Sequence, residues 1–256
     1  MQPRAIIAAR AVIANTRKLG CTIPDGIDAA DLRATRLTDA GDQIGPPDGE
    51  LIDAFLAAVD AGKDPAADKN VQRALTADRL ANENLRAAIS NHAATLLIGA
   101  LVEHAPQLFD EWDAITNRAS TALTEAHAVL ADTDLDDTKA VVQLGGKAAD
   151  AWAKATNAVA IIDRLNLVWQ QWAEVTRRAP SNAAYCNLRF ADITPADWQA
   201  HKLAGRVDPW TLVRIGYTLE LADPDEMRRR IDTHRAHDAA EEAARLARAN
   251  RAARTG

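Results

Sequence analysis

The 256-residue sequence contains two cysteines, Cys21 and Cys186, which lie far apart and form no CxxC motif. This scarcity excludes a disulfide-rich scaffold and favours two reduced thiols in an intracellular protein. Long apolar runs are missing as well: the longest, AATLLIGALV at 93–102, is too short to cross a bilayer. Arginines interrupt the apolar N-terminus, which argues against a secretory signal peptide. We therefore expect a cytoplasmic protein without membrane association, or a virion component if the chain is encoded by a phage.

Aromatic residues make up 4% of the chain, and the β-branched residues are scattered, so that no stretch predicts a strand. The net charge of −6 argues against a nucleic-acid binder that uses its whole surface, although a local basic patch is compatible with it. Alanine is abundant, at about a fifth of all residues. Because alanine is the best helix former and buries little area, the composition predicts an all-α protein whose helices pack closely.

Helical periodicity and helix breakers divide the chain into four predicted segments. These are an N-terminal helical arm (1–41), a long-helix body (50–178), a small helical cluster (181–222) and an Arg-rich C-terminal helix (223–256). The stretch GDQIGPPDG at 41–49 is the clearest loop, because two adjacent prolines and three glycines cannot continue a helix. In the last two segments, Thr194, Asp208 and Asp223 each precede a proline, and each is predicted to cap a helix.

Two heptad patterns predict a long antiparallel helical hairpin with coiled-coil-like packing, formed by residues 108–131 and 137–178. The first seam comprises Leu108, Trp112, Ile115, Ala119, Ala122, Ala126 and Val129. The second comprises Ala148, Trp152, Ala155, Val159, Ile162, Leu165, Trp169, Trp172 and Val175. The alanines of the first seam would let a partner helix approach closely. The tryptophans are expected in the core, with the anchoring of a partner as the alternative.

No catalytic, metal-binding or phosphate-binding motif is present, so neither a cofactor nor a metal is expected. The DTDLDD turn at 132–137 lacks the glycine and glutamate of a calcium loop, and we expect it to cap the following helix. The GGK triplet at 145–147 lacks the flanking residues of a phosphate loop. His234 and His237 are expected to be solvated surface side chains rather than metal ligands. A site assembled in space would have to gather several of His92, Glu103, His104, Asp110, Glu111 and Asp113.

Arginines are concentrated in the last segment, at Arg228, Arg229, Arg230, Arg245, Arg248, Arg251 and Arg254. The last four recur at every third residue with no acidic residue after Glu242, so on a helix they form a wrapping band. Such a band could contact phosphates or an acidic protein surface. The alternative is a solvated helix end whose arginines complement the helix dipole and pair with neighbouring acids.

These features favour a non-enzymatic structural or interaction protein, a helical assembly or scaffolding component that self-associates or binds a protein partner. Long helices with a basic terminal helix are a general plan of such proteins, including those of phage particles, and the comparison is one of architecture alone. The first alternative is a nucleic-acid-associated protein that binds through its Arg-rich C-terminal helix. The second is an enzyme whose site is not visible in the sequence.

Overall fold

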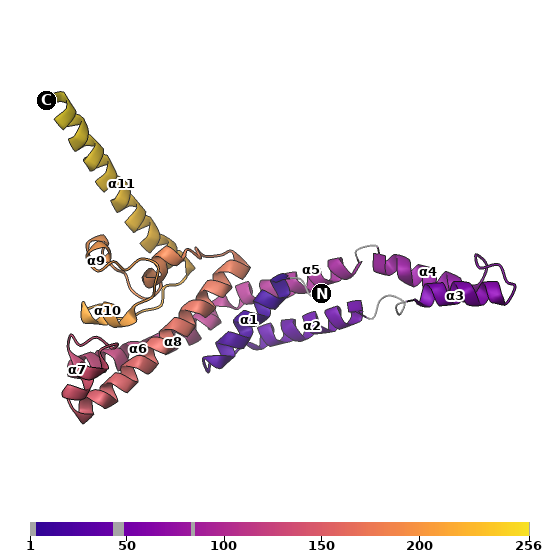
Figure 1. Cartoon of the computed structure of the whole chain (residues 1–256), viewed down its shortest axis with the longest axis horizontal. Coiled ribbons are helices and arrows are strands. Elements are labelled where there is room, and N and C mark those ends of the chain that lie inside the picture. The colour runs from indigo at the N-terminus through magenta and orange to yellow at the C-terminus, as the bar shows by residue number, and fades with distance from the viewer. Residues whose placement is uncertain (1–3, 43–48, 83–84, 256) are drawn as a thin grey trace. The chain divides into compact units, whose positions relative to one another are not determined.

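The computed structural model describes residues 4–42, 49–82 and 85–255, which form eleven α-helices and one 3-10 helix and contain no strand (Figure 1). The all-α prediction is confirmed. Within these ranges, none of the helices combines the length and the apolar character that a membrane crossing needs. The chain packs as two compact units, Met1–Ala11 with Pro24–His104, and Val12–Ile23 with Ala105–Gly256. The division into four segments, which rests on local helix breakers, stays a prediction.

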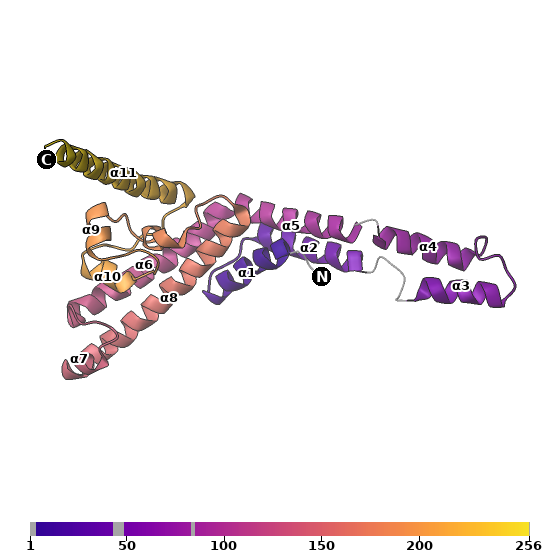
Figure 2. The ribbon, with the colours of Figure 1, turned by 45° about the horizontal axis from the view of Figure 1, so that its top comes forward.

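The first unit contains two pairs of packed helices and the beginning of α1 (Arg4–Lys18). Helix α2 (Asp25–Asp42) packs against α5 (Leu85–Glu103), and α3 (Glu50–Asp60) packs against α4 (Lys69–Asn82) (Figures 1 and 2). Gly41 approaches Ile89 so closely that an added Cβ would lie 3.3 Å from its Cγ2 atom. Small residues therefore set the spacing of α2 and α5. The predicted loop at 41–49 lies mostly outside the described residues, and Gly41 itself is helical.

The second unit is built around α6 (Ala105–Leu130) and α8 (Gly146–Thr176), which lie side by side in both views (Figures 1 and 2). The short helix α7 (Thr138–Gln143) occupies their connection. Asp137 accepts a hydrogen bond from the Ala140 amide at 3.0 Å, which is the cap expected of the acidic turn. Gly145, at φ 91°, separates α7 from α8 in a conformation that favours glycine.

The buried faces of α6 and α8 differ in part from the predicted seams. In α6 the seam is buried from Leu108 to Ala119, but Val129 is 47% exposed and its neighbour Leu130 is buried instead. A straight helix has 3.6 residues per turn, so its buried face advances relative to a strict heptad, and this drift accounts for the change. In α8, Ala151 and Ala158 are buried where the prediction placed Trp152 and Val159, which are half-buried.

A small helical cluster packs on this pair and includes η1 (Ala183–Arg189), α9 (Pro195–Ala200), α10 (Pro209–Arg214) and the start of α11 (Pro224–Thr255). All three predicted caps are confirmed. Thr194 accepts from the Asp197 amide at 3.1 Å, Asp208 from the Thr211 amide at 2.9 Å, and Asp223 from the Glu226 amide at 2.8 Å. Each cap satisfies a backbone donor that the first turn of a helix leaves free.

The tryptophans hold the second unit together. Trp112, Trp169 and Trp172 are fully buried, which confirms the prediction that they belong to the core. The indole N–H of Trp169 donates to the Ala222 carbonyl at 3.2 Å, and that of Trp152 donates to the Leu135 carbonyl at 2.8 Å. Because these carbonyls lie in connecting segments, each indole fastens a loop to a long helix.

Candidate interaction surfaces

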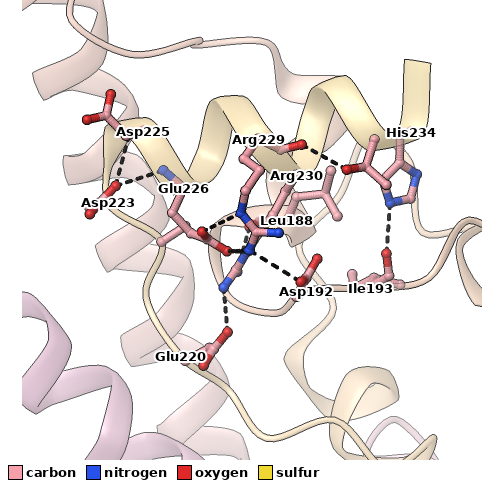
Figure 3. Close-up of polar contacts among 12 residues, drawn as sticks. Leu188, Asp192, Ile193, Glu220, Asp223, Asp225, Glu226, Arg229, Arg230 and His234 are labelled. Carbon is pink, nitrogen blue, oxygen red and sulfur yellow. Dashed lines mark hydrogen bonds and ion pairs between the residues drawn. The ribbon is translucent and has the colours of Figure 1, made fainter. Parts of the chain in front are cut away.

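The first turns of α11 are held by a network centred on Arg230 (Figure 3). This side chain is 2% exposed. Its Nε donates to Glu226 at 2.7 Å, its Nη1 donates to the Leu188 carbonyl at 3.0 Å, and its Nη2 donates to Glu220. A buried arginine needs such partners, because an unpaired buried charge is costly. Because Arg230 is buried, neither a protein partner nor a phosphate can reach its side chain.

His234 belongs to the same anchored base of α11, and the expectation that it is a solvated surface residue is wrong. It is 3% exposed, and its Nε2 lies 2.8 Å from the Ile193 carbonyl (Figure 3). With Met227 and Ile231 it occupies one helix face at spacings of four and three residues, and both of these neighbours are buried. Across the described residues, no group of three potential metal ligands is found.

The two arginines next to Arg230 are exposed but already have partners. Arg228 donates to Asp225 at 2.7 Å and to the Arg178 carbonyl at 2.8 Å, and Arg229 pairs with Glu226 and Asp192. Hydrogen bonds from Arg229 and then from Arg230 hold the pKa of the Glu226 carboxyl below its ordinary value. These arginines therefore connect α11 to the cluster, which sequence reasoning did not foresee.

Solvent surrounds most of the distal part of α11, and Gln199 of α9 donates a hydrogen bond to Glu241 near its start at 3.0 Å. Every side chain from Asp238 to Arg251 is exposed, and both views show this part projecting from the rest of its unit (Figures 1 and 2). Arg245 pairs with Glu242 at 2.8 Å, and Arg248 donates to the Ala244 carbonyl at 3.3 Å. The side chain of Arg254 lies outside the described residues.

A basic groove lies on the second unit between α6 and α8 and has a volume of about 500 Å³. Four exposed cations line it: Lys18, Arg118, Lys154 and Arg164. No acidic residue is among its lining, and none of the four cations forms an ion pair with any carboxylate that the structure describes. Buried Ile115, Ala119 and Ala158 form an aliphatic floor. The groove thus combines positive charge that forms no described ion pair with aliphatic lining residues.

The first unit carries a surface of the opposite kind on α3. Ile52, Phe55, Leu56 and Val59 are exposed, by 65% for Ile52, and they recur at spacings of three, four and seven residues. They form one apolar stripe on the helix, and Ile52, Phe55 and Leu56 border a cavity of about 450 Å³ between α3 and α4. At 100° per residue, Asp53 and Asp60 follow one flank of the stripe, and both are exposed. Neither carboxylate forms an ion pair with a described residue.

The residues considered for an enzyme site are not gathered at either cavity. None of His92, Glu103, His104, Asp110, Glu111 and Asp113 lines the basic groove or the cavity beside α3. Glu111 accepts a hydrogen bond from the Thr22 amide at 3.2 Å. Asp113 accepts from Asn117 at 2.9 Å and from the Leu221 amide at 3.4 Å. These two carboxylates thus hold loops in place within the second unit.

Arg189 is a buried charged residue that sequence reasoning missed. It is fully buried at the end of η1, donates to Asn166, and its guanidinium carbon lies 4.7 Å from the centre of a Trp169 ring. Burial lowers its pKa to about 10. Nothing in the local sequence distinguishes it from a surface arginine, because its partners Asn166 and Trp169 lie 20 or more residues away.

The chain matches no model of a known protein family, no curated protein and no solved structure. Its function is therefore argued from its own residues.

Proposed function

We propose that this protein is a non-enzymatic interaction protein, a helical assembly or scaffolding component of a larger macromolecular particle such as that of a phage. The observation that carries the proposal is the exposed distal part of α11, Asp238–Arg251, which continues from a buried base. A helix with a fixed base and a free outer half is suited to presenting a surface to a partner. In this proposal α6 and α8 serve as a rigid antiparallel hairpin with coiled-coil-like packing.

The energetics of an exposed helix support a partner. Isolated helices of this length are only marginally stable in water, because most of the stability of helices in proteins comes from tertiary packing. The distal part has pairs such as Arg245–Glu242, and such local pairs contribute about 0.2–0.5 kcal/mol each. Its alanines and the exposed Leu246 offer small apolar surface at the same time. A partner that covers this surface would supply the missing packing.

Light scattering of the full chain and of a variant that ends at Ala240 tests the proposal. This variant keeps Arg230 and His234, so the buried base of α11 stays intact. We expect the full chain to form complexes with itself or with a purified partner, and we expect the shortened chain to lose at least part of that association. A full chain that stays monomeric at every concentration and binds no protein would contradict the proposal.

The alternative is nucleic-acid binding through the same helix. The order of charged residues at the end of the chain favours this alternative. After the last acidic residue, Glu242, the charged residues are all arginines: Arg245, Arg248, Arg251 and Arg254. Binding through such a band releases counterions and weakens steeply as salt rises. A fluorescent duplex that binds the full chain at low salt, but not the variant ending at Ala240, would favour this alternative. Equal binding by both chains, or binding that ignores salt, would exclude it.

A further inference from the structure

We infer that α3 of one molecule docks into the basic groove between α6 and α8 of a second copy, so that the chain assembles head to tail. This inference rests on the proposed assembly role and names one contact between copies of the chain, a contact that does not involve the distal part of α11. It starts from two surfaces that complement each other in charge and in apolar character.

The docking helix has the pattern of a helix that binds in a groove. Ile52, Phe55, Leu56 and Val59 occupy the relative positions 0, 3, 4 and 7 that such helices use as anchors, and all four are exposed in the single chain. A contiguous apolar stripe on a surface helix marks an interaction site more often than scattered apolar residues do. Phe55 is the largest anchor, and aromatic side chains are enriched among the residues that dominate binding energy.

The charges that flank the two surfaces are opposite and free. Asp53 and Asp60 lie on one side of the stripe, while Lys154 and Arg164 lie at the rim of the groove, and none of them pairs with a described residue. Unpaired charges of opposite sign steer association and select the partner. At 1.5 Å per residue, Asp53 and Asp60 lie about 10 Å apart along α3. Lys154 and Arg164 lie about 15 Å apart along α8, a separation that their long side chains can reduce.

The floor of the groove favours a helix over a nucleic acid. Its half-buried lining residues Leu19, Ala122 and Ile161 offer aliphatic surface to a second helix. The lining contains no aromatic residue on which a base could stack. The two surfaces differ from each other, so the contact is heterologous. Repeating such a contact from one copy to the next generates a ring or an open filament.

A charge-swap experiment tests the inference on the full chain. The first variant carries Asp53→Lys and Asp60→Lys, and the second carries Lys154→Glu and Arg164→Glu. Each variant alone opposes like charges at the contact, and we expect its self-association to weaken about tenfold or more at low salt. An equimolar mixture restores opposite charges at both types of contact, so its average mass should return to that of the wild type. Asp132→Asn with Asp136→Asn, in the exposed acidic turn, is the control for altered charge elsewhere.

A variant with Ile52→Ser and Phe55→Ser tests the apolar part of the contact. Its association should weaken by roughly ten- to a hundredfold, because the transfer of two apolar side chains from water is lost. Circular dichroism and the melting temperature check that each variant folds, which we expect because the altered side chains are exposed.

The outcomes separate this inference from the proposed function. If the wild type associates while neither charge variant weakens it, the contact lies elsewhere, and the docking of α3 is overturned while the assembly role stands. If the wild type stays monomeric, the docking is overturned, and the assembly role is decided by its own test with the variant ending at Ala240. Binding of an oligonucleotide that is lost in the second variant and unchanged in the first would assign the groove to phosphates instead.

Discussion

Arg230 and Glu226 lie one turn apart on α11 and are joined by a hydrogen bond of 2.7 Å between the arginine Nε and a carboxylate oxygen, with the guanidinium buried. The same guanidinium donates to the Leu188 carbonyl and to Glu220, so it connects α11 to the cluster below it. The base of α11 is therefore part of the second unit. The exposed distal part begins after this base, which explains how a helix with so few contacts can be presented in a defined place.

Arg230→Ala should lower the free energy of unfolding of the second unit by about 2–3 kcal/mol, because it leaves the Leu188 carbonyl without a donor and removes charged hydrogen bonds. Arg228 lies two residues before Arg230 and is exposed, so Arg228→Ala is the matched control. It should lower the free energy of unfolding by less than about 1 kcal/mol. Urea unfolding followed by tryptophan fluorescence measures both. Equal costs for the two variants would show that the buried network does not hold α11.

Acid should loosen the base of α11. The pKa of Glu226 is lowered in the folded chain by Arg229 and Arg230, so its stabilisation is complete above its ordinary value of 4.5 and is lost as the pH falls through the lower folded value. Below about pH 4.5, amide hydrogen exchange of residues 226–234 should therefore accelerate more in the wild-type chain than in the Glu226→Gln variant. Both exchange rates are first corrected for the intrinsic pH dependence of exchange. The same acid response in both proteins would contradict the assignment to Glu226.

Two glycines of the first unit should respond to alanine in opposite ways. A Cβ added at Gly26 would lie 2.0 Å from Nε2 of His104, so the ring must move, and we expect a loss of about 1–3 kcal/mol. A Cβ added at Gly99, inside α5, meets nothing within 4 Å, and Gly99→Ala should stabilise the helix by about 0.5–1 kcal/mol. Thermal unfolding measures the pair. A stabilising Gly26→Ala would mean that α2 does not pack on His104 as described.

Both thiols should react slowly in the folded chain. Burial, with a smaller contribution from Glu111, raises the pKa of Cys21 to about 11, and burial also raises the pKa of Cys186. Because the thiolate is the nucleophile, labelling of Cys21 at pH 8 should be roughly a hundredfold slower than in denaturant. Timed labelling of the Cys186→Ser variant isolates Cys21. Rapid labelling without denaturant would show that Cys21 is accessible.

Local signals in the sequence predicted the helices well. The three caps that each stand before a proline, Thr194, Asp208 and Asp223, were predicted because each depends on residues within one turn. The acidic cap at Asp137 was predicted for the same reason. The buried tryptophans were predicted because large aromatic residues on a helical stripe usually face a core. The exposure of Val129 was not predicted, because a strict heptad and a straight helix differ by a small angle that accumulates over the three heptads from Leu108 to Val129.

The candidate surfaces depended on contacts that the sequence does not show. Arg230 and His234 look like members of a solvated basic helix, and they are buried because Leu188, Ile193 and Glu220 meet them from other segments. The basic groove gathers Lys18 with cations of α6 and α8 that are up to 146 residues away. The exposure of the stripe on α3 follows from how α4 packs, which periodicity alone cannot give.

The most direct test of the assembly role is sedimentation velocity of the wild-type chain over a hundredfold range of concentration, at low and moderate salt, with and without a nucleic-acid duplex. We expect an average mass that rises above the 27.6 kDa of one chain as concentration increases, more strongly at low salt, and that is unchanged by the duplex. A mass of one chain at every concentration, increasing only when the duplex is added, would contradict it and favour nucleic-acid binding.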